Sequence, residues 1–120
     1  REQGMRWHQM SEIETRGFDS VLEDAISEAL DGPELIYLSV DIDVLDPAFA
    51  PATGTPEPGG LTSVELLRAV RTIVGSVETI AADVVEVAPD YEGPANITAE
   101  AALRVILEIL SSLANKKKSL

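Results

Sequence analysis

The chain has 120 residues, enough for one ordinary domain or for part of a larger one. Apolar residues make up 45% of it and can form a core, which aliphatic side chains must fill because aromatic residues reach only 4%. The formal net charge of −12 would repel phosphate backbones and anionic lipids, so we expect neither nucleic acid nor a membrane surface as a partner. A cationic ligand or a metal ion fits this charge better.

The composition also bears on where the protein works. Without cysteine the chain has no disulfide framework and no thiolate metal site, which fits a reducing compartment, and we expect a cytoplasmic protein. No apolar run approaches the length of a membrane span, and the charged start REQGMR is unlike a signal peptide. Because that start lacks a methionine, we expect that the chain was cut from a longer one.

In the first third of the chain, the sequence pattern predicts a short strand and two helical segments. Residues 4–9, GMRWHQ, have the character of a strand. Ser11 and Glu14 have the spacing of a capping box and predict a brief helical turn. From Phe18 to Leu30 apolar residues recur with a helical period, and a Gly-Pro pair then ends the helix.

Two apolar strands and two more helices follow. Residues 35–40 are apolar on both faces, as in a strand covered on both sides, and lead into a loop that holds four of the seven prolines. Thr62 and Glu65 form a second capping-box pattern before an amphipathic helix. Residues 77–87 predict another buried strand, and Thr98 is a candidate cap for the last helix. The apolar stripe of that helix comprises Ala102, Val105, Ile106, Ile109, Leu110 and Leu113.

The order of these elements predicts the fold class. Strands and helices alternate as β-α-β-α-β-α, which implies right-handed crossovers between parallel strands. We therefore expect an α/β fold with three layers, α/β/α, and a mainly parallel sheet. Residues 114–120, with three consecutive lysines, are expected to be a disordered tail.

Carboxylates gather where the predicted strands end. Asp41 and Asp43 close the first apolar strand, Glu86 closes the next, and ligands of such sheets collect at this edge. Alternation along an extended strand would place Asp41 and Asp43 on one side, with Ile42 opposite. No lysine or arginine follows nearby, so a divalent cation such as Mg²⁺, Ca²⁺ or Mn²⁺ would relieve their repulsion. The alternative is that they accept hydrogen bonds from loop amides.

Other polar residues allow more than one interpretation. Asp46 precedes a proline and is expected to start a turn. Glu86 alone could bind a cation, ligate a metal or form a surface pair. Thr53 and Thr55 flank a glycine, where their hydroxyls could line a ligand pocket or close a hydrogen-bonded turn. His8 is the single histidine, and its expected role is structural.

Two segments carry a resemblance to a known family. Residues 39–60, SVDIDVLDPAFAPATGTPEPGG, resemble the signature of the ureohydrolases, which include arginase, agmatinase and related amidinohydrolases. The EPGG continuation is closer to agmatinase-type members. Residues 83–89, DVVEVAP, resemble the second landmark of the family, a glutamate at a strand end followed by a proline. The resemblance covers about residues 3–113 and implies an arginase-like fold.

The resemblance also implies a chemistry. In this family the aspartates that match Asp41 and Asp43 ligate manganese, and the first bridges two Mn²⁺ ions. A hydroxide held between the ions attacks the guanidinium carbon of a small cationic substrate, agmatine-like here, and urea leaves. The glutamate that matches Glu86 engages the guanidinium group, and Thr55 lies where a hydroxyl near the substrate is expected. Members are commonly homo-oligomers, trimers or hexamers.

The chain departs from the family pattern in one large respect. The other metal ligands and an acid/base histidine belong to earlier motifs that this sequence lacks, and His8 matches none of them. Residues 1–120 thus resemble the C-terminal part of one ureohydrolase domain, and we expect the chain alone to be inactive. One alternative is a non-enzymatic remnant. Another is a DxD-type phosphotransferase with Asp41 as nucleophile and Asp43 as acid/base, which would need a lysine outside the tail.

Overall fold

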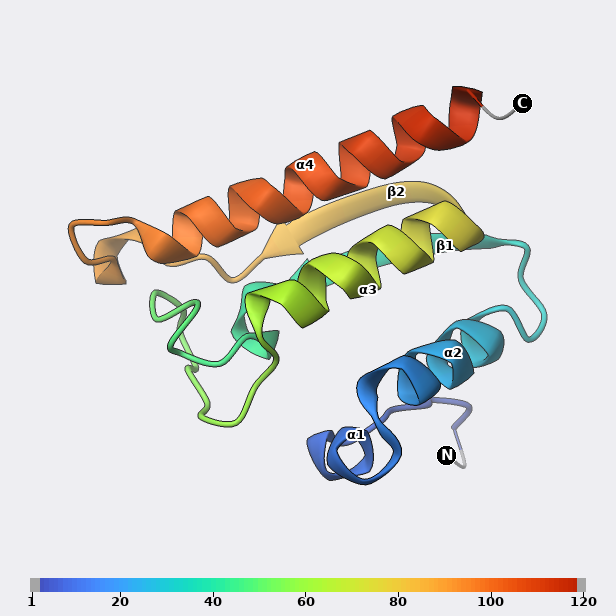
Figure 1. The fold of residues 1–120 in the computed structure, drawn as a ribbon, viewed down its shortest axis with the longest axis horizontal. Coiled ribbons are helices and arrows are strands. Elements are labelled where there is room, and N and C mark those ends of the chain that lie inside the picture. The colour runs from blue at the N-terminus through green and yellow to red at the C-terminus, as the bar shows by residue number, and fades with distance from the viewer. Residues whose placement is uncertain (1–2, 119–120) are drawn as a thin grey trace.

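The computed structural model describes residues 3–118 of the chain (Figure 1). This part of the chain forms four α-helices, two strands and two short 3-10 helices in the following order: α1 (Met10–Arg16), α2 (Phe18–Ala29), β1 (Leu35–Asp41), η1 (Ile42–Val44), α3 (Ser63–Ser76), β2 (Glu78–Val85), η2 (Pro89–Tyr91) and α4 (Ile97–Lys118). Within these residues, no helix combines the length and the apolar character that crossing a lipid bilayer would require.

The two strands form a parallel pair joined by α3. The register places Leu35 beside Glu78 at one end and Asp41 beside Val85 at the other, with an irregularity after Ile36. Both strands therefore end at the same edge of the sheet, the edge on the left of Figure 1. This confirms the predicted parallel crossover, which brings the residues that follow β1 and β2 close together.

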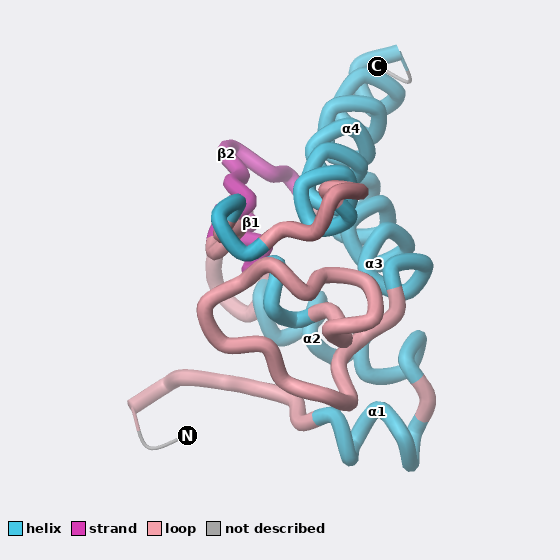
Figure 2. Tube along the Cα trace, turned by 90° about the vertical axis from the view of Figure 1, so that its left-hand side faces the viewer, coloured by secondary structure: helices cyan, strands magenta, loops and turns pink. Residues whose placement is uncertain are grey.

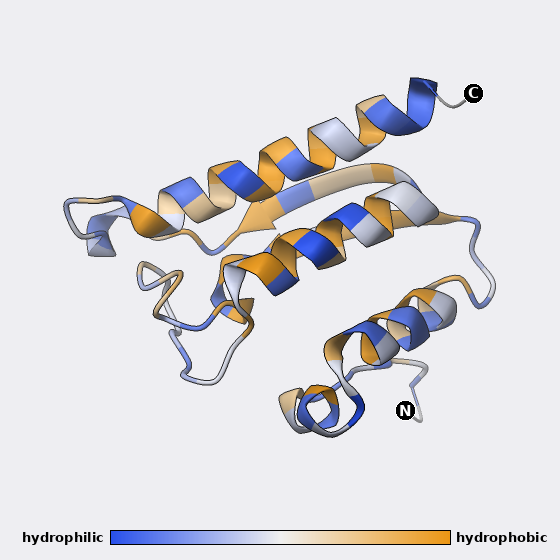
Figure 3. Cartoon of the chain, in the orientation of Figure 1, coloured by the Kyte–Doolittle hydropathy of each residue, from blue (hydrophilic) through white to orange (hydrophobic). Residues whose placement is uncertain are grey.

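Helices α3 and α4 cover one face of the sheet. Their colours alternate between apolar and hydrophilic in Figure 3, as expected of helices with one buried side. The core comprises Val40, Ile42, Leu45, Ala50, Leu61, Leu66, Val70, Val74, Ala102, Val105 and Ile109. Helix α2 packs beside α3, where Arg68 lies 5.1 Å from the centre of the Phe18 ring.

The opposite face of the sheet stays open in the described part of the chain. Leu35, Tyr37 and Ile80 are exposed by 52%, 57% and 65%. The molecule is thus an α/β unit with a parallel sheet, as predicted, and residues 3–118 supply the helices of one covered face. The predicted inner stripe of α4 is also only partly buried, because Ile106 and Leu110 face outward.

The N-terminal segment differs from the prediction. Residues 4–9 form turns and loop rather than a strand, and no third strand lies beside β1 or β2 among the described residues. A strand is stabilised by hydrogen bonds to a neighbour, and this segment has none there. The predicted capping box at Ser11 is also absent, because α1 begins one residue earlier, at Met10, without a side-chain cap.

The starts of α3 and α4 show one correct prediction and one error. At α3 the Thr62 hydroxyl accepts from the Glu65 amide at 3.2 Å, and the Glu65 carboxylate accepts from the Thr62 amide at 2.8 Å, so the capping box forms. Helix α4 begins at Ile97, which places Thr98 inside it. Thr98 is therefore not the cap, and its hydroxyl binds another segment.

The C-terminal end also differs from the expected disordered tail. Helix α4 continues to Lys118, and the last two residues, 119 and 120, lie outside the described part of the chain. Lys116 donates to the carbonyl of Val77 at 2.8 Å and pairs with Glu78 at 3.0 Å. These contacts attach the last turns of α4 to the start of β2.

Candidate functional site

The predicted site residues lie at the edge of the sheet where both strands end, which faces the viewer in Figure 2. Asp41 is the last residue of β1, and Asp43 lies within η1. The Asp43 amide donates to Asp41 Oδ1 at 3.0 Å, so the two residues are in direct contact. Ile42 between them is fully buried in the core, which fixes the turn of the chain at this point.

This geometry corrects one step of the sequence argument. The chain leaves the extended conformation at Ile42, so strand alternation is not what brings Asp41 and Asp43 together. The tight 3-10 turn does so instead, with the Asp41 side chain accepting from its first turn. Ile42 points into the core.

Negative charge accumulates at the site within the described chain. Burial raises the pKa of Asp41, and the neighbouring carboxylates of Asp43 and Glu86 raise it further, against the lowering effect of the Asp43 amide. The ion pairs formed by residues 3–118 all lie elsewhere, on the segment before α1, on the four α-helices, just after α2 and at the start of β2. A bound cation would relieve this accumulation of negative charge.

The loop between η1 and α3 is held by Asp46. One oxygen of its carboxylate accepts from the Ala48 amide at 2.8 Å, and the other accepts from the Gly59 amide at 2.9 Å. These hydrogen bonds lower the pKa of Asp46. A Cβ on Gly60 would lie 2.5 Å from the Asp46 nitrogen, so only glycine fits where the two ends of the loop meet. The predicted structural role of Asp46 is confirmed.

The tip of this loop reaches the site carboxylates. Thr55 donates to Asp43 Oδ2 at 2.8 Å, and Thr53, which is 2% exposed, donates to the carbonyl of Glu86 at 2.9 Å. Between them, a Cβ on Gly54 would lie 3.9 Å from a carboxylate oxygen of Glu86. The structure therefore brings Asp41, Asp43, Thr55 and Glu86 to one edge of the sheet.

Glu86 has an unusual backbone conformation. It follows β2 directly, and its φ of 66° lies in the left-handed region, which residues other than glycine rarely adopt. Its side chain is exposed and borders an open hollow of about 540 Å³ that Gly54 and residues 87–91 also line. Such backbone conformations persist where the surroundings fix them, and they are common at functional sites.

No sequence pattern indicates that Thr98 supports this loop. Thr98 is fully buried, and its hydroxyl accepts from the Ala52 amide at 2.8 Å. The two residues are 46 positions apart, and a threonine beside a helix start is ordinarily a cap. Only the path of the loop against α4 shows the actual partner.

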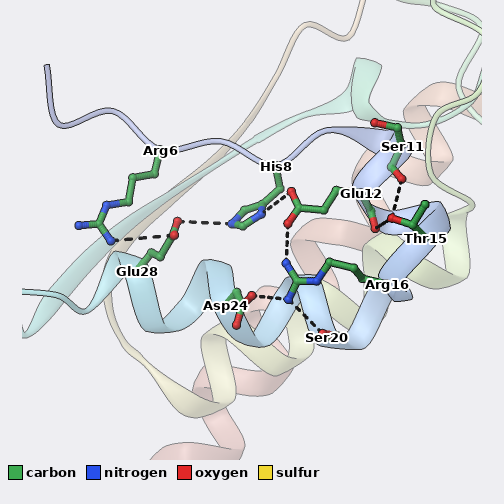
Figure 4. Close-up of polar contacts among 9 residues, drawn as sticks. All are labelled: Arg6, His8, Ser11, Glu12, Thr15, Arg16, Ser20, Asp24 and Glu28. Carbon is green, nitrogen blue, oxygen red and sulfur yellow. Dashed lines mark hydrogen bonds and ion pairs between the residues drawn. The ribbon is translucent and has the colours of Figure 1, made fainter. Parts of the chain in front are cut away.

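His8 lies outside the site, in a polar network that joins the segment before α1 to α1 and α2 (Figure 4). Its Nδ1 lies 3.0 Å from Glu12 Oε2, and its Nε2 lies 3.4 Å from Glu28 Oε2. Arg16 pairs with Glu12 as well, and the His8 and Arg16 contacts lower the pKa of Glu12. This agrees with the structural role expected of His8.

The side chains at the sheet edge include suitable metal ligands but too few of them for a complete metal site. Asp41 and Asp43 offer adjacent carboxylate oxygens, which hard divalent cations prefer. Across residues 3–118, no group of three or more histidine, cysteine, aspartate or glutamate side chains is arranged to hold a metal ion. The two aspartates therefore fit as a part of a metal site whose remaining ligands must come from elsewhere.

Comparisons with known proteins show which proteins the chain resembles. The chain is 40% identical to an agmatinase of Chromobacterium violaceum over 105 residues, which are 88% of this chain and 31% of that protein. It is 42% identical to a guanidinopropionase of Pseudomonas aeruginosa over 114 residues, 95% of this chain and 35% of the relative. The solved structure of the arginase from Bacillus caldovelox superposes with a TM-score of 0.82 at 32% identity, covering 90% of this chain and 36% of that one.

These matches cover most of this chain but only part of each relative. The chain spans 24–35% of the length of the curated relatives that it matches. The model of the arginase family matches residues 1–111, nearly the whole of the sequence. The chain belongs to the arginase family and corresponds to a part of that fold.

Proposed function

We propose that this chain supplies one part of the active site of a manganese-dependent hydrolase that releases urea from a guanidino compound. The observation that carries the proposal is the convergence of Asp41, Asp43 and Glu86 at the edge of the sheet where β1 and β2 end. Relatives named agmatinase, guanidinopropionase and arginase all match the chain, so their names favour guanidino substrates as a class. An agmatine-like substrate is our specific proposal.

Glu86 is the proposed acceptor for the guanidinium group. A carboxylate that faces a planar guanidinium can accept two parallel charge-assisted hydrogen bonds. Thr55 is proposed to bind the guanidinium group beside Glu86. Its hydroxyl donates its proton to Asp43, and the lone pairs of the oxygen can still accept a hydrogen bond from the substrate. The excess of acidic side chains around this edge favours a cationic substrate and disfavours an anionic one.

Asp41 and Asp43 are the proposed manganese ligands of this chain. Two ions in the complete site would lower the pKa of bound water and so provide hydroxide near neutral pH. The role of this chain is then to hold its two carboxylates in place, Asp41 through the Asp43 amide and Asp43 through Thr55. No other residue of the chain is proposed to act as an acid or base.

The phosphotransferase alternative has little support. It needs a lysine near Asp41, and all three lysines of the chain lie at residues 116–118. Lys116 is bound to Val77 and Glu78 at the opposite end of β2. A catalytically incomplete remnant is the alternative to an enzyme, and the assay below separates the two.

The test of the proposal is metal content and urea formation in the complete protein. Replacing Asp43 by Ala should reduce bound manganese, measured by elemental analysis, and abolish urea release from agmatine. Glu34→Ala, at the exposed residue before β1 and the opposite end of the sheet, is the matched control. Full manganese occupancy and full activity in the Asp43 variant would refute the assignment.

We also propose a homo-oligomer, a trimer or hexamer, in the cytoplasm, without nucleic acid or membrane as partner. The net charge of −12 supports the absence of polyanionic partners. The exposed apolar side chains of the sheet support association with further protein surface.

A further inference from the structure

Glu86 has a backbone conformation that residues other than glycine rarely adopt. A φ of 66° brings the Cβ of a non-glycine residue close to backbone atoms, so the surrounding structure must hold it there. The contacts made by residues 52 and 53 of the loop account for this. They bind the chain at Glu86 itself and two residues later, at Ala88.

The first contact is made by Thr53. This side chain is 2% exposed and donates its hydroxyl proton to the carbonyl of Glu86 at 2.9 Å. The neighbouring Ala52 carbonyl accepts from the Ala88 amide at 2.9 Å. Two adjacent loop residues therefore fix both the carbonyl of Glu86 and the amide two positions further on.

A third hydrogen bond anchors the loop itself. The Ala52 amide donates to the Thr98 hydroxyl at 2.8 Å, and Thr98 is fully buried in the first turn of α4. A rigid helix thus holds Ala52, and through it the backbone around Glu86. This arrangement explains why Thr98 does not cap its own helix.

We propose that Thr53 and Thr98 are positioning residues that hold Glu86 in its left-handed conformation and so aim its carboxylate. The inference rests on the proposed role of Glu86 in binding guanidinium. Neither threonine needs to touch the substrate. Each acts through hydrogen bonds to the loop or to the Glu86 backbone.

The conformation of Glu86 can be measured directly on this chain by NMR. In the left-handed region the amide proton lies closer to the Hα of its own residue than in the extended region, so the intraresidue NOE is strong. Thr53→Val and Thr98→Val keep the side-chain shape but remove the hydroxyl, and both should weaken this NOE at Glu86. Thr53→Ser and Thr98→Ser keep the hydroxyl and should restore it.

A third buried threonine provides the control. Thr79 is 8% exposed and donates to the carbonyl of Val77 at 3.4 Å, at the other end of β2. Thr79→Val should lower stability in a similar way while leaving the Glu86 NOE unchanged. If Thr98→Val does not fold, the Thr53 pair decides the question alone.

The complete protein gives the functional measurement. Thr53→Val should lower kcat/KM for a guanidino substrate by about tenfold to a hundredfold, as small displacements of a binding group do, with manganese content unchanged. Thr53→Ser should recover most of the activity. A strong Glu86 NOE retained in Thr53→Val, or a Ser variant as impaired as its Val counterpart, would overturn the proposal. Should Glu86→Gln leave turnover intact, the proposed function fails for Glu86, whereas the NOE would still report whether the threonines hold its backbone.

Discussion

Glu86 is the side chain whose role separates substrate binding from metal binding at this site. It lies one strand away from Asp41 and Asp43, yet near enough for its charge to raise the pKa of Asp41. In the complete protein Glu86→Gln should reduce turnover by on the order of a hundredfold, since charge-assisted hydrogen bonds contribute about 1.5–3 kcal/mol. Manganese content should stay unchanged. Loss of the metal before loss of turnover would make Glu86 a ligand, and Glu34→Gln is the control for a carboxylate elsewhere.

Asp46 contributes to stability rather than to chemistry. Its two amide contacts lower its pKa below the usual 3.8, so the ionised form is favoured by folding. The stabilisation is complete above this ordinary value and is lost as the pH falls through the lower pKa of the folded state. Asp46→Asn should therefore lower the Tm at pH 7, and its difference from the wild type should shrink in acid. A difference that is constant in thermal unfolding from pH 7 to pH 3 would contradict this.

At the scale of elements, the capping box of α3 offers the sharpest test. Thr62→Ala removes the hydroxyl that accepts from the Glu65 amide and donates to the Glu65 carboxylate, while the bond from the Thr62 amide to that carboxylate stays. The free energy of unfolding should fall by about 1 kcal/mol, the usual cost of losing such a cap. Thr72→Ala, at an exposed position inside the same helix, should be neutral or slightly stabilising. Equal effects of the two variants in urea unfolding would show that the box contributes nothing.

The elements also show what the sequence could and could not predict. The strand that ends at Asp41 and the one that ends before Glu86 were predictable because their apolar runs are continuous, and the capping box at Thr62 because a helical pattern follows it directly. The strand at residues 4–9 does not form, since a strand needs a partner that local pattern cannot supply. Thr98 looked like a cap because its true partner, Ala52, is distant in sequence.

The site was predictable in composition but not in geometry. The carboxylates at strand ends indicated Asp41, Asp43 and Glu86, and the resemblance placed the hydroxyl of Thr55 near the substrate. The 3-10 turn at Ile42 and the left-handed φ at Glu86 depend on contacts with the loop and the core, which no local pattern encodes. The prediction that Asp41 and Asp43 lie close together was therefore correct, but strand alternation is not the cause of their proximity.

For the whole molecule, the open face of the sheet predicts association. Among residues 3–118 each strand has one unpaired edge, and Leu35, Tyr37 and Ile80 are exposed on the sheet. Unpaired edges and exposed apolar side chains favour pairing with another chain. The purified chain should therefore sediment as more than a monomer at micromolar concentration. A monodisperse monomer would contradict this expectation, and Tyr37→Lys, at the centre of the open face, should shift the distribution toward monomer.

The last prediction concerns catalysis by the whole chain: alone, it should not hydrolyse guanidino compounds at an appreciable rate. Two aspartates are the only proposed metal ligands, and no set of three or more suitable side chains gathers among residues 3–118. Two carboxylates cannot hold two dications in a defined geometry, because water would fill most of each coordination shell and the site would stay positively charged. Loose positioning of reacting groups costs large factors in rate.

Nor can the chain replace the missing acid/base group. Its single histidine, His8, lies beside Glu12 of α1 and Glu28 of α2, outside the site, and a second copy of the chain would bring only the same histidine. General acid/base catalysis contributes about 10²–10⁴-fold, so its absence alone is severe. The assay is urea formation from agmatine with added Mn²⁺, comparing the 120-residue chain with the complete protein. Turnover within about tenfold of the complete protein, a barrier difference of only ~1.4 kcal/mol, would show that the described residues suffice for the reaction.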